Sequence, residues 1–223
     1  SAMSGFDATQ VAAISISQLA AMSNLDIAAL SIGGVAGLSS AQLASLAPTQ
    51  MAALNGAQAG ALSTTALTGL TLTQALSLTT TQLAGFNTTQ VAHLDANHVS
   101  LLNTTQLRAI SADGASGFTA TNIDYLNATQ IQSLTTAQIS ALSTTTVQSL
   151  DTTEIGALTS SQFASLASTQ IPALTSTQVA ALSSQQFNAL GTTQLGGLAE
   201  TQIPSLTTTQ ISGLSTTRIA ALA

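Results

Sequence analysis

An eight-residue repeat runs from Asp7 to Leu222 without a change of register, and it constrains the fold more than any other feature. The plainest of its 27 consecutive copies is TTAQISAL, residues 135–142. We number the octad positions 1 to 8, so that Gln138 stands at position 4 and Leu142 at position 8. A unit this short can bury an apolar face only against other copies. The sequence therefore predicts a repeat array whose core is formed by positions 5 and 8, because both columns are apolar.

Positions 1 and 4 together predict the start of a helix. Position 1 is Ser, Thr, Asp or Asn in 23 copies, and position 4 is Gln in 18. Residues of the first group accept hydrogen bonds from free backbone N–H groups at a helix start, and Gln three residues later can bind the N–H of the cap residue. Seven of the eight acidic residues also fall in positions 1 to 4, where a helix start attracts negative charge. We predict an all-α solenoid of 27 octapeptide repeats that forms an elongated rod, with one short capped helix of about two turns in each octad.

A β-solenoid is the alternative fold, since short Thr-rich repeats also occur in that architecture. Against it, the apolar columns are three and then five residues apart, and odd steps change face in a strand unless a corner falls in every gap. In its favour, Pro172 and Pro204 stand at position 6, where a proline removes a hydrogen bond of the helix. If the octads are helical, we expect these two copies to be distorted, down to a single 3₁₀-like turn.

The chain is expected to comprise a leader, residues 1–6, and one octapeptide-repeat solenoid, residues 7–223. Ser-Ala-Met resembles the remnant of a cleaved expression tag, and Ala223 opens a further octad, so we expect a piece of a longer array. Glycines interrupt the pattern in residues 111–126, where we expect a kink or hinge. Small residues at position 7 are expected to face the adjacent turn of the solenoid, and position 6 is expected to face solvent. Two octads per superhelical turn are expected, with three as the alternative.

The composition excludes several classes of function. Only 4% of the residues are charged, there is no Lys, and the net charge is −6, which argues against binding to nucleic acid or to an anionic membrane surface. No apolar run is long enough for a membrane span, and without Cys there is no disulfide or thiolate site. No Gly-x-Ser-x-Gly motif occurs and the chain has only two histidines, so we expect neither an enzyme nor any catalytic, cofactor-binding or metal site.

Two small groups of residues could still be ion ligands. His93, Asp95 and His98 lie close together in the sequence, and Asp113 and Asp124 flank the interrupted stretch. The two histidines belong to positions 7 and 4 of adjacent octads, and the spacing of the two aspartates matches no dedicated calcium loop. We expect the histidines to be solvent-accessible variants of tolerant positions, while the sequence leaves ion binding by either group open.

Units such as STTTVQSL, TSTQVAAL and TTTQISGL resemble the Thr-Gln-Ile/Val-x-x-Leu tandem arrays of large repetitive bacterial secreted or surface proteins of the adhesin-like kind. The likeness covers essentially the whole chain. It implies an extracellular or cell-surface spacer or scaffold that projects neighbouring domains, with self-association end to end or side by side. The alternatives are a filament segment and a binding surface for glycan or ice, formed by ladders of Gln and Thr, since position 3 is Thr in 17 copies.

Overall fold

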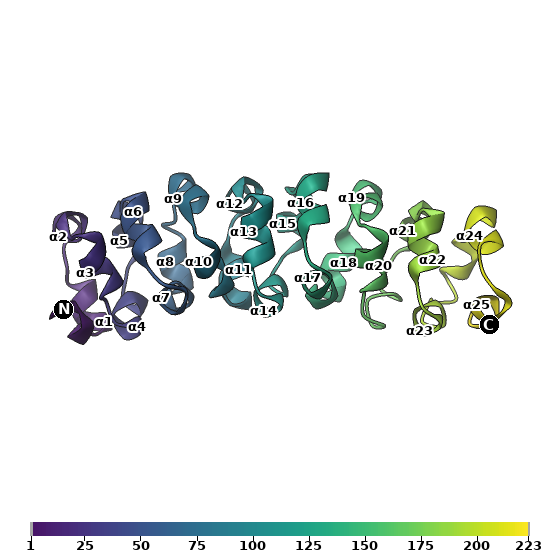
Figure 1. Ribbon diagram of the computed structural model, residues 1–223, viewed down its shortest axis with the longest axis horizontal. Helices are drawn as coiled ribbons and strands as arrows, with labels where there is room; N and C mark the ends of the chain where they lie inside the picture. Colours follow the sequence, from purple (N-terminus) through teal and green to yellow (C-terminus); the bar gives the residue numbers. More distant parts are fainter. Residues whose placement is uncertain (1, 223) are drawn as a thin grey trace. The chain divides into compact units, whose positions relative to one another are not determined.

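A computed structural model of the chain describes residues 2–222 and shows an all-helical repeat protein (Figure 1). No strand occurs in this range, so the predicted helical octad is confirmed and the β-solenoid alternative is wrong. The chain divides into two compact units, Ser1–Gly117 and Phe118–Ala223, and the boundary lies inside the interrupted stretch 111–126. Ser1 of the predicted leader and Ala223 of the predicted further octad lie outside the described residues.

In the first unit the helices are η1 (Ala2–Gly5), α1 (Ala8–Ala12), α2 (Ile16–Ala21), α3 (Asn24–Ala28), α4 (Ile32–Ala36), α5 (Ser40–Ser45), α6 (Pro48–Ala53), α7 (Gly56–Ala61), α8 (Thr64–Leu67), α9 (Leu72–Ser77), α10 (Thr80–Ala84), α11 (Thr88–His93), α12 (Ala96–Leu101), α13 (Thr104–Ala109) and α14 (Ala112–Ala115). In the second unit they are α15 (Ala120–Asp124), α16 (Ala128–Ser133), α17 (Thr136–Ala141), α18 (Thr144–Ser149), α19 (Thr152–Ala157), α20 (Ser160–Ala164), α21 (Ser176–Ala181), α22 (Ser184–Ala189), α23 (Thr192–Leu195), η2 (Ile203–Ser205), α24 (Thr208–Ser212) and α25 (Thr216–Ala220).

The octad 135–142 shows how many of the helices begin and end, while others, such as α10, end one residue earlier with a helical C-cap at position 7. Thr135 is extended and its side chain accepts a hydrogen bond from Gln138 N, while Gln138 Oε1 accepts one from Thr135 N at 2.7 Å. The helix ends at Leu142, which is again extended (φ −57°, ψ 143°) and leads directly into the next cap residue. Leu142 and the next cap residue thus connect one helix to the next, and no described residue has a positive φ. The α-helices contain four to six residues, slightly fewer than the two turns expected.

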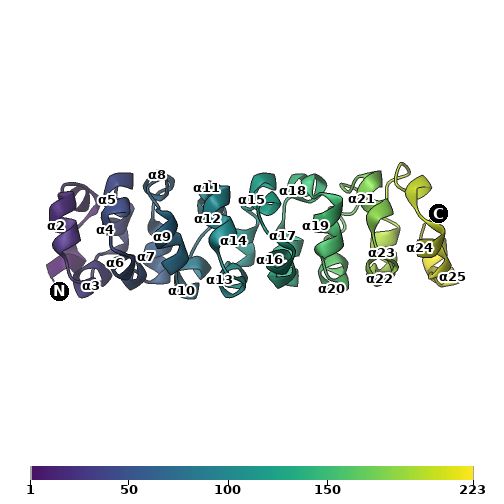
Figure 2. The same cartoon turned by 90° about the horizontal axis from the view of Figure 1, so that it is seen from above.

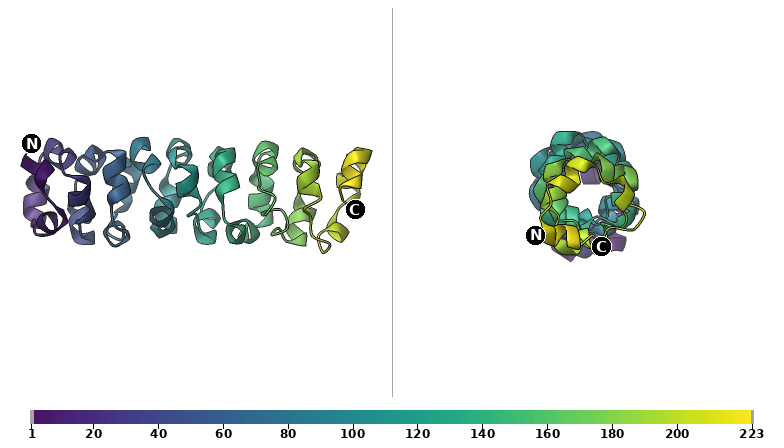
Figure 3. Two further views of the ribbon diagram at one scale, coloured as in Figure 1. Left: turned by 90° about the horizontal axis from the view of Figure 1, so that it is seen from below. Right: turned by 90° about the vertical axis from the view of Figure 1, so that its right-hand side faces the viewer.

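Within each unit, each helix packs against the helix three octads further along the chain. Examples are α2 with α5 and α3 with α6 in the first unit, which lie side by side in Figure 2, and α15 with α18 and α16 with α19 in the second. Figure 3 shows the helices of the second unit, green to yellow, distributed around a central axis. Positions 5 and 8 are buried in most octads and form the core, as predicted.

The expectation of two octads per superhelical turn is wrong, and the alternative of three is nearer, because packing partners are three octads apart. A helix of four to six residues is only about 6–9 Å long at 1.5 Å per residue. Two such helices cannot enclose both apolar columns, so further octads are needed to close each turn.

None of the described helices has the length and apolar character of a membrane-spanning helix.

The two octads with proline at position 6 contain no α-helix, as predicted. Residues 168–173, which include Pro172, form turns, and Pro204 lies in the 3₁₀ helix η2. Both octads also begin with alanine, which has no capping side chain. Gln170 Oε1 nevertheless accepts a hydrogen bond from Ala167 N at 2.6 Å, so this half of the helix-start arrangement persists where the helix itself is lost.

Position 7 faces the neighbouring turn, which confirms the predicted small-residue seam. A Cβ added at Gly85 would overlap the backbone of Gly56, which stands at position 2 of the octad three places earlier. The same overlap relates Gly37 to Ala8. The backbones of successive turns therefore approach each other closely at this seam.

We expect Gly85→Ala to lower the free energy of unfolding by about 1–3 kcal/mol, the usual cost of overpacking. Gly85 has right-handed helical dihedral angles that alanine accepts, so the loss would come from the contact with Gly56. Gly156→Ala is the matched control, because a Cβ there meets nothing within 4 Å, and a helix gains up to about 1 kcal/mol from this change. Urea denaturation of both variants measures the two changes in the free energy of unfolding. Changes of the same sign would contradict the close approach of the two backbones at Gly85.

Candidate functional site

The side chains at position 4 form a buried polar column, which is the most unusual feature of the structure. From Gly34 to Gln186 every residue at this position is buried, and Gln82 is 0% exposed. Buried amides need hydrogen-bond partners, since an unpaired polar group is costly away from water. We therefore expect these amides to have partners beyond their own octad.

Gln178 illustrates how both ends of the amide are used. Its Oε1 accepts a hydrogen bond from Thr175 N at 2.7 Å, at the start of α21. Its Nε2 donates to the carbonyl oxygens of Val147 (3.0 Å), Gln148 (3.2 Å) and Leu150 (2.5 Å), at the end of α18. The last carbonyls of a helix have no partner within that helix. One amide therefore completes the start of its own helix and the end of a helix four octads earlier.

We call the hydrogen bond from a position 4 side chain to the position 8 carbonyl 28 residues earlier the inter-turn bond. It occurs throughout both units with donor–acceptor distances of 2.5–2.9 Å. The glutamines that donate it are Gln42, Gln50, Gln58, Gln74, Gln82, Gln90, Gln106, Gln162, Gln170, Gln178, Gln186, Gln194, Gln202 and Gln210.

Three other residue types reproduce the inter-turn bond. Thr146 Oγ1 donates to Phe118 O at 2.8 Å, and Arg218 Nη2 donates to Leu190 O at 2.6 Å. His98 Nε2 lies 2.7 Å from Leu70 O. The shared property of these side chains is a donor that reaches the preceding turn.

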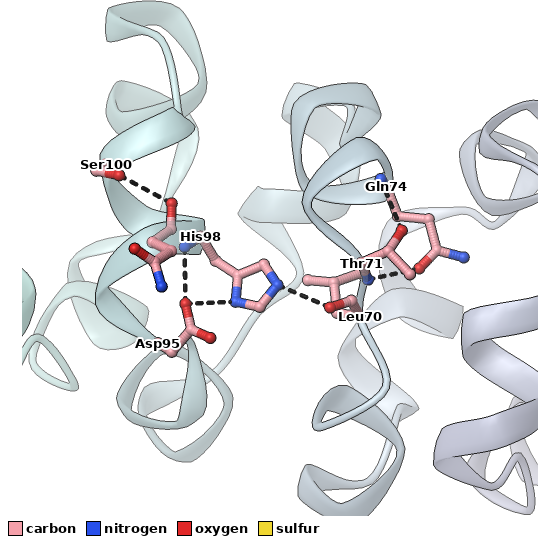
Figure 4. Close-up of polar contacts among 7 residues, drawn as sticks. Leu70, Thr71, Gln74, Asp95, His98 and Ser100 are labelled. Atoms are coloured by element: carbon pink, nitrogen blue, oxygen red, sulfur yellow. Dashed lines mark hydrogen bonds and ion pairs between the residues drawn. The ribbon is translucent and has the colours of Figure 1, made fainter.

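Figure 4 shows how His98 replaces glutamine in this role. Its Nε2 faces Leu70 O, and its Nδ1 lies 2.8 Å from Asp95 Oδ1, which also accepts a hydrogen bond from His98 N. The expectation that both histidines are solvent-accessible is therefore wrong for His98, because its ring occupies the buried column. It is correct for His93, which is exposed, with Nδ1 2.8 Å from Thr89 O.

The residues considered as ion ligands do not form one group. Asp95 is the cap of α12. Asp113 lies in α14 of the first unit, and Asp124 lies in α15 of the second. Within residues 2–222 no three His, Asp or Glu side chains gather closely enough to hold a metal ion.

Glu154 is the acidic member of the buried column. Its side chain is 8% exposed, and its Oε2 accepts a hydrogen bond from Asp151 N at 2.8 Å. Burial raises the pKa of the Glu154 carboxyl, the hydrogen bond from Asp151 lowers it, and the negative charges of Asp151 and Asp124 raise it further; the net shift is upward. From the sequence alone Glu154 is only one of the seven acidic residues in positions 1 to 4, because its buried surroundings involve another turn.

The alternative of a binding surface formed by Gln and Thr ladders is not supported in its Gln half. From Gln42 to Gln186 the glutamine side chains at position 4 are buried, so they do not form an exposed ligand-binding row. Position 3, the Thr column, is exposed in every octad. Within each unit packing partners are three octads apart, so successive threonines of this column do not lie on one flat surface.

The fold and this column define an all-helical tandem-repeat protein. Residues 164–200 match the family model described as the ALTTAQ repeat. The matched segment contains Gln170, Gln178, Gln186 and Gln194, four of the donors of the inter-turn bond. No curated protein matches the chain.

Proposed function

We propose that the chain is a non-catalytic structural array that serves as a spacer or scaffold within an exported bacterial protein. The inter-turn bond is the observation that carries this proposal. Because the same bond recurs at the eight-residue period in most octads, an array of this kind can be lengthened by whole octads without any new type of contact. The match to a repeat family supports the structural role, and the resemblance to secreted and surface arrays supports export.

The distribution of polar groups also supports a scaffold. The side chains with the greatest hydrogen-bonding capacity, the glutamine amides, are used inside the array to pair backbone groups. Most exposed side chains are small hydroxyl or alanine side chains and few are charged, although some large apolar residues such as Leu25 are exposed as well. This arrangement favours a stable, soluble support over a chemically specific site.

A spacer should lengthen in proportion to the number of octads, and distance measurements between two spin labels test this. The chain has no Cys, so cysteines replacing Thr129 and Thr201, two exposed position 3 residues of the second unit, can be labelled selectively. We expect the mean distance to increase as copies of residues 175–182 are inserted after Leu182, with a periodic component because each octad also rotates the label about the axis. Labels at Thr129 and Thr145, which do not flank the insertion, are the control and should keep their distance. Distances that broaden or stop growing with added octads would argue against a spacer.

A further inference from the structure

Glu154 interrupts the series of inter-turn donors within the second unit, as Gly34, Ala66 and Gly114, which have no donor side chain, do in the first. The carbonyl that lies 28 residues before it is Leu126 O, which occupies the same place in its octad as the acceptors of the glutamine bonds. An ionised carboxylate has acceptors only and cannot donate to it. Among the described residues no hydrogen bond to Leu126 O is found. The turn that joins octads 119–126 and 151–158 therefore lacks the bond that its neighbours have.

No positive charge compensates this buried carboxyl. Helix α19, which carries Glu154, packs against α16 and α21, and its octad also bonds to α22 through Gln186. The octads of α15, α16, α21 and α22 contain no Lys, Arg or His. The titratable groups around Glu154 are Asp151 in its own octad, and Asp124 and the exposed Tyr125 in the octad of α15.

We propose that the side chain of Glu154 forms the inter-turn bond only when its carboxyl group is protonated. When protonated, its carboxyl group donates a hydrogen bond to Leu126 O, as the glutamine amide does in other octads, while its second oxygen still accepts from Asp151 N. When the carboxyl is ionised, one oxygen still accepts from Asp151 N, but the other has no proton to donate to Leu126 O. The turn between α15 and α19 is therefore held more firmly in acid than at neutral pH.

The sign of the pH dependence follows from the burial of this group. The pKa of Glu154 in the folded chain lies above its ordinary value of 4.5. The unfolded chain therefore loses this proton first as the pH rises, which favours unfolding. The contribution of Glu154 to stability is fully present below about pH 4 and is lost as the pH rises through the folded pKa.

Glu154→Gln tests the proposal, because glutamine supplies the donor at every pH. We expect the variant to unfold at a higher temperature than the original chain at neutral pH, and the difference to disappear as the pH falls below 4.5. Hydrogen exchange should show several-fold slower opening of residues 151–158 in the variant at neutral pH. Glu200→Gln is the matched control: Glu200 is an exposed position 2 residue, so its replacement should give no such pH-dependent difference.

A second variant tests the same mechanism in the opposite direction. Gln178→Glu places a carboxyl opposite Leu150 O and should introduce the pH dependence that Glu154→Gln removes. A stability difference for Glu154→Gln that is the same at every pH would overturn the proposal, since it would indicate packing rather than proton binding. The absence of any difference, or a pH-independent effect of Gln178→Glu, would also overturn it.

Discussion

Phe163→Ala is expected to lower the free energy of unfolding by about 3–5 kcal/mol, the usual loss when a buried aromatic side chain is truncated. Phe163 stands at position 5 in α20 and is 0% exposed. Helix α20 packs against both α17 and α22, so the cavity would lie between three turns of short helices. Urea denaturation followed by circular dichroism measures the loss.

Two further variants separate the effect of the cavity from a general effect of substitution. Phe163→Leu introduces the residue that other octads carry at position 5, such as Leu43 and Leu83, which are also 0% exposed, so it should cost much less than the alanine change. Gln148→Ala alters an exposed position 6 residue and should stay within about 0.5 kcal/mol of the original chain. Equal losses for Phe163→Ala and Gln148→Ala would contradict the assignment of position 5 to the core.

The parts of the fold that were predictable from sequence are those decided within one octad. The bond between Thr135 and Gln138 spans three residues, so their spacing alone indicates a helix start. The distortion at Pro172 and Pro204 was predictable for the same reason, because proline acts on the helix that contains it. The core columns followed from their period, which is the same in every copy.

The size of the superhelical turn and the burial of the glutamines were not predictable in this way. In a uniform repeat every octad offers the same surfaces, so the pattern does not distinguish a partner two octads away from one four octads away. The one signal was chemical: Arg218 stands in the glutamine column, and arginine has no acceptor with which to close a capping box. Gln and Arg side chains share hydrogen-bond donors but not an acceptor. A column that contains both therefore indicates that these side chains donate to carbonyl groups outside their own octad.

The inter-turn bond has its own test in Gln178→Ala, which we expect to lower the free energy of unfolding by about 2–4 kcal/mol. The change leaves Thr175 N and the buried Leu150 O without their partners, and an unsatisfied buried group costs about 1–3 kcal/mol. The loss can be measured by urea denaturation, and hydrogen exchange should be faster both in α21 and at the end of α18, four octads earlier.

Gln10→Ala separates this bond from the cap, because Gln10 has only the capping half of the arrangement. Its Oε1 accepts from Asp7 N at 2.9 Å, but its side chain is exposed and bonds to no other turn. Losing a helix cap of this kind costs about 1 kcal/mol, so the excess loss at Gln178 measures what the amide contributes between turns. If Gln178→Ala cost no more than Gln10→Ala, glutamine would act only as a cap, and the apolar columns at positions 5 and 8 would hold the turns together without it.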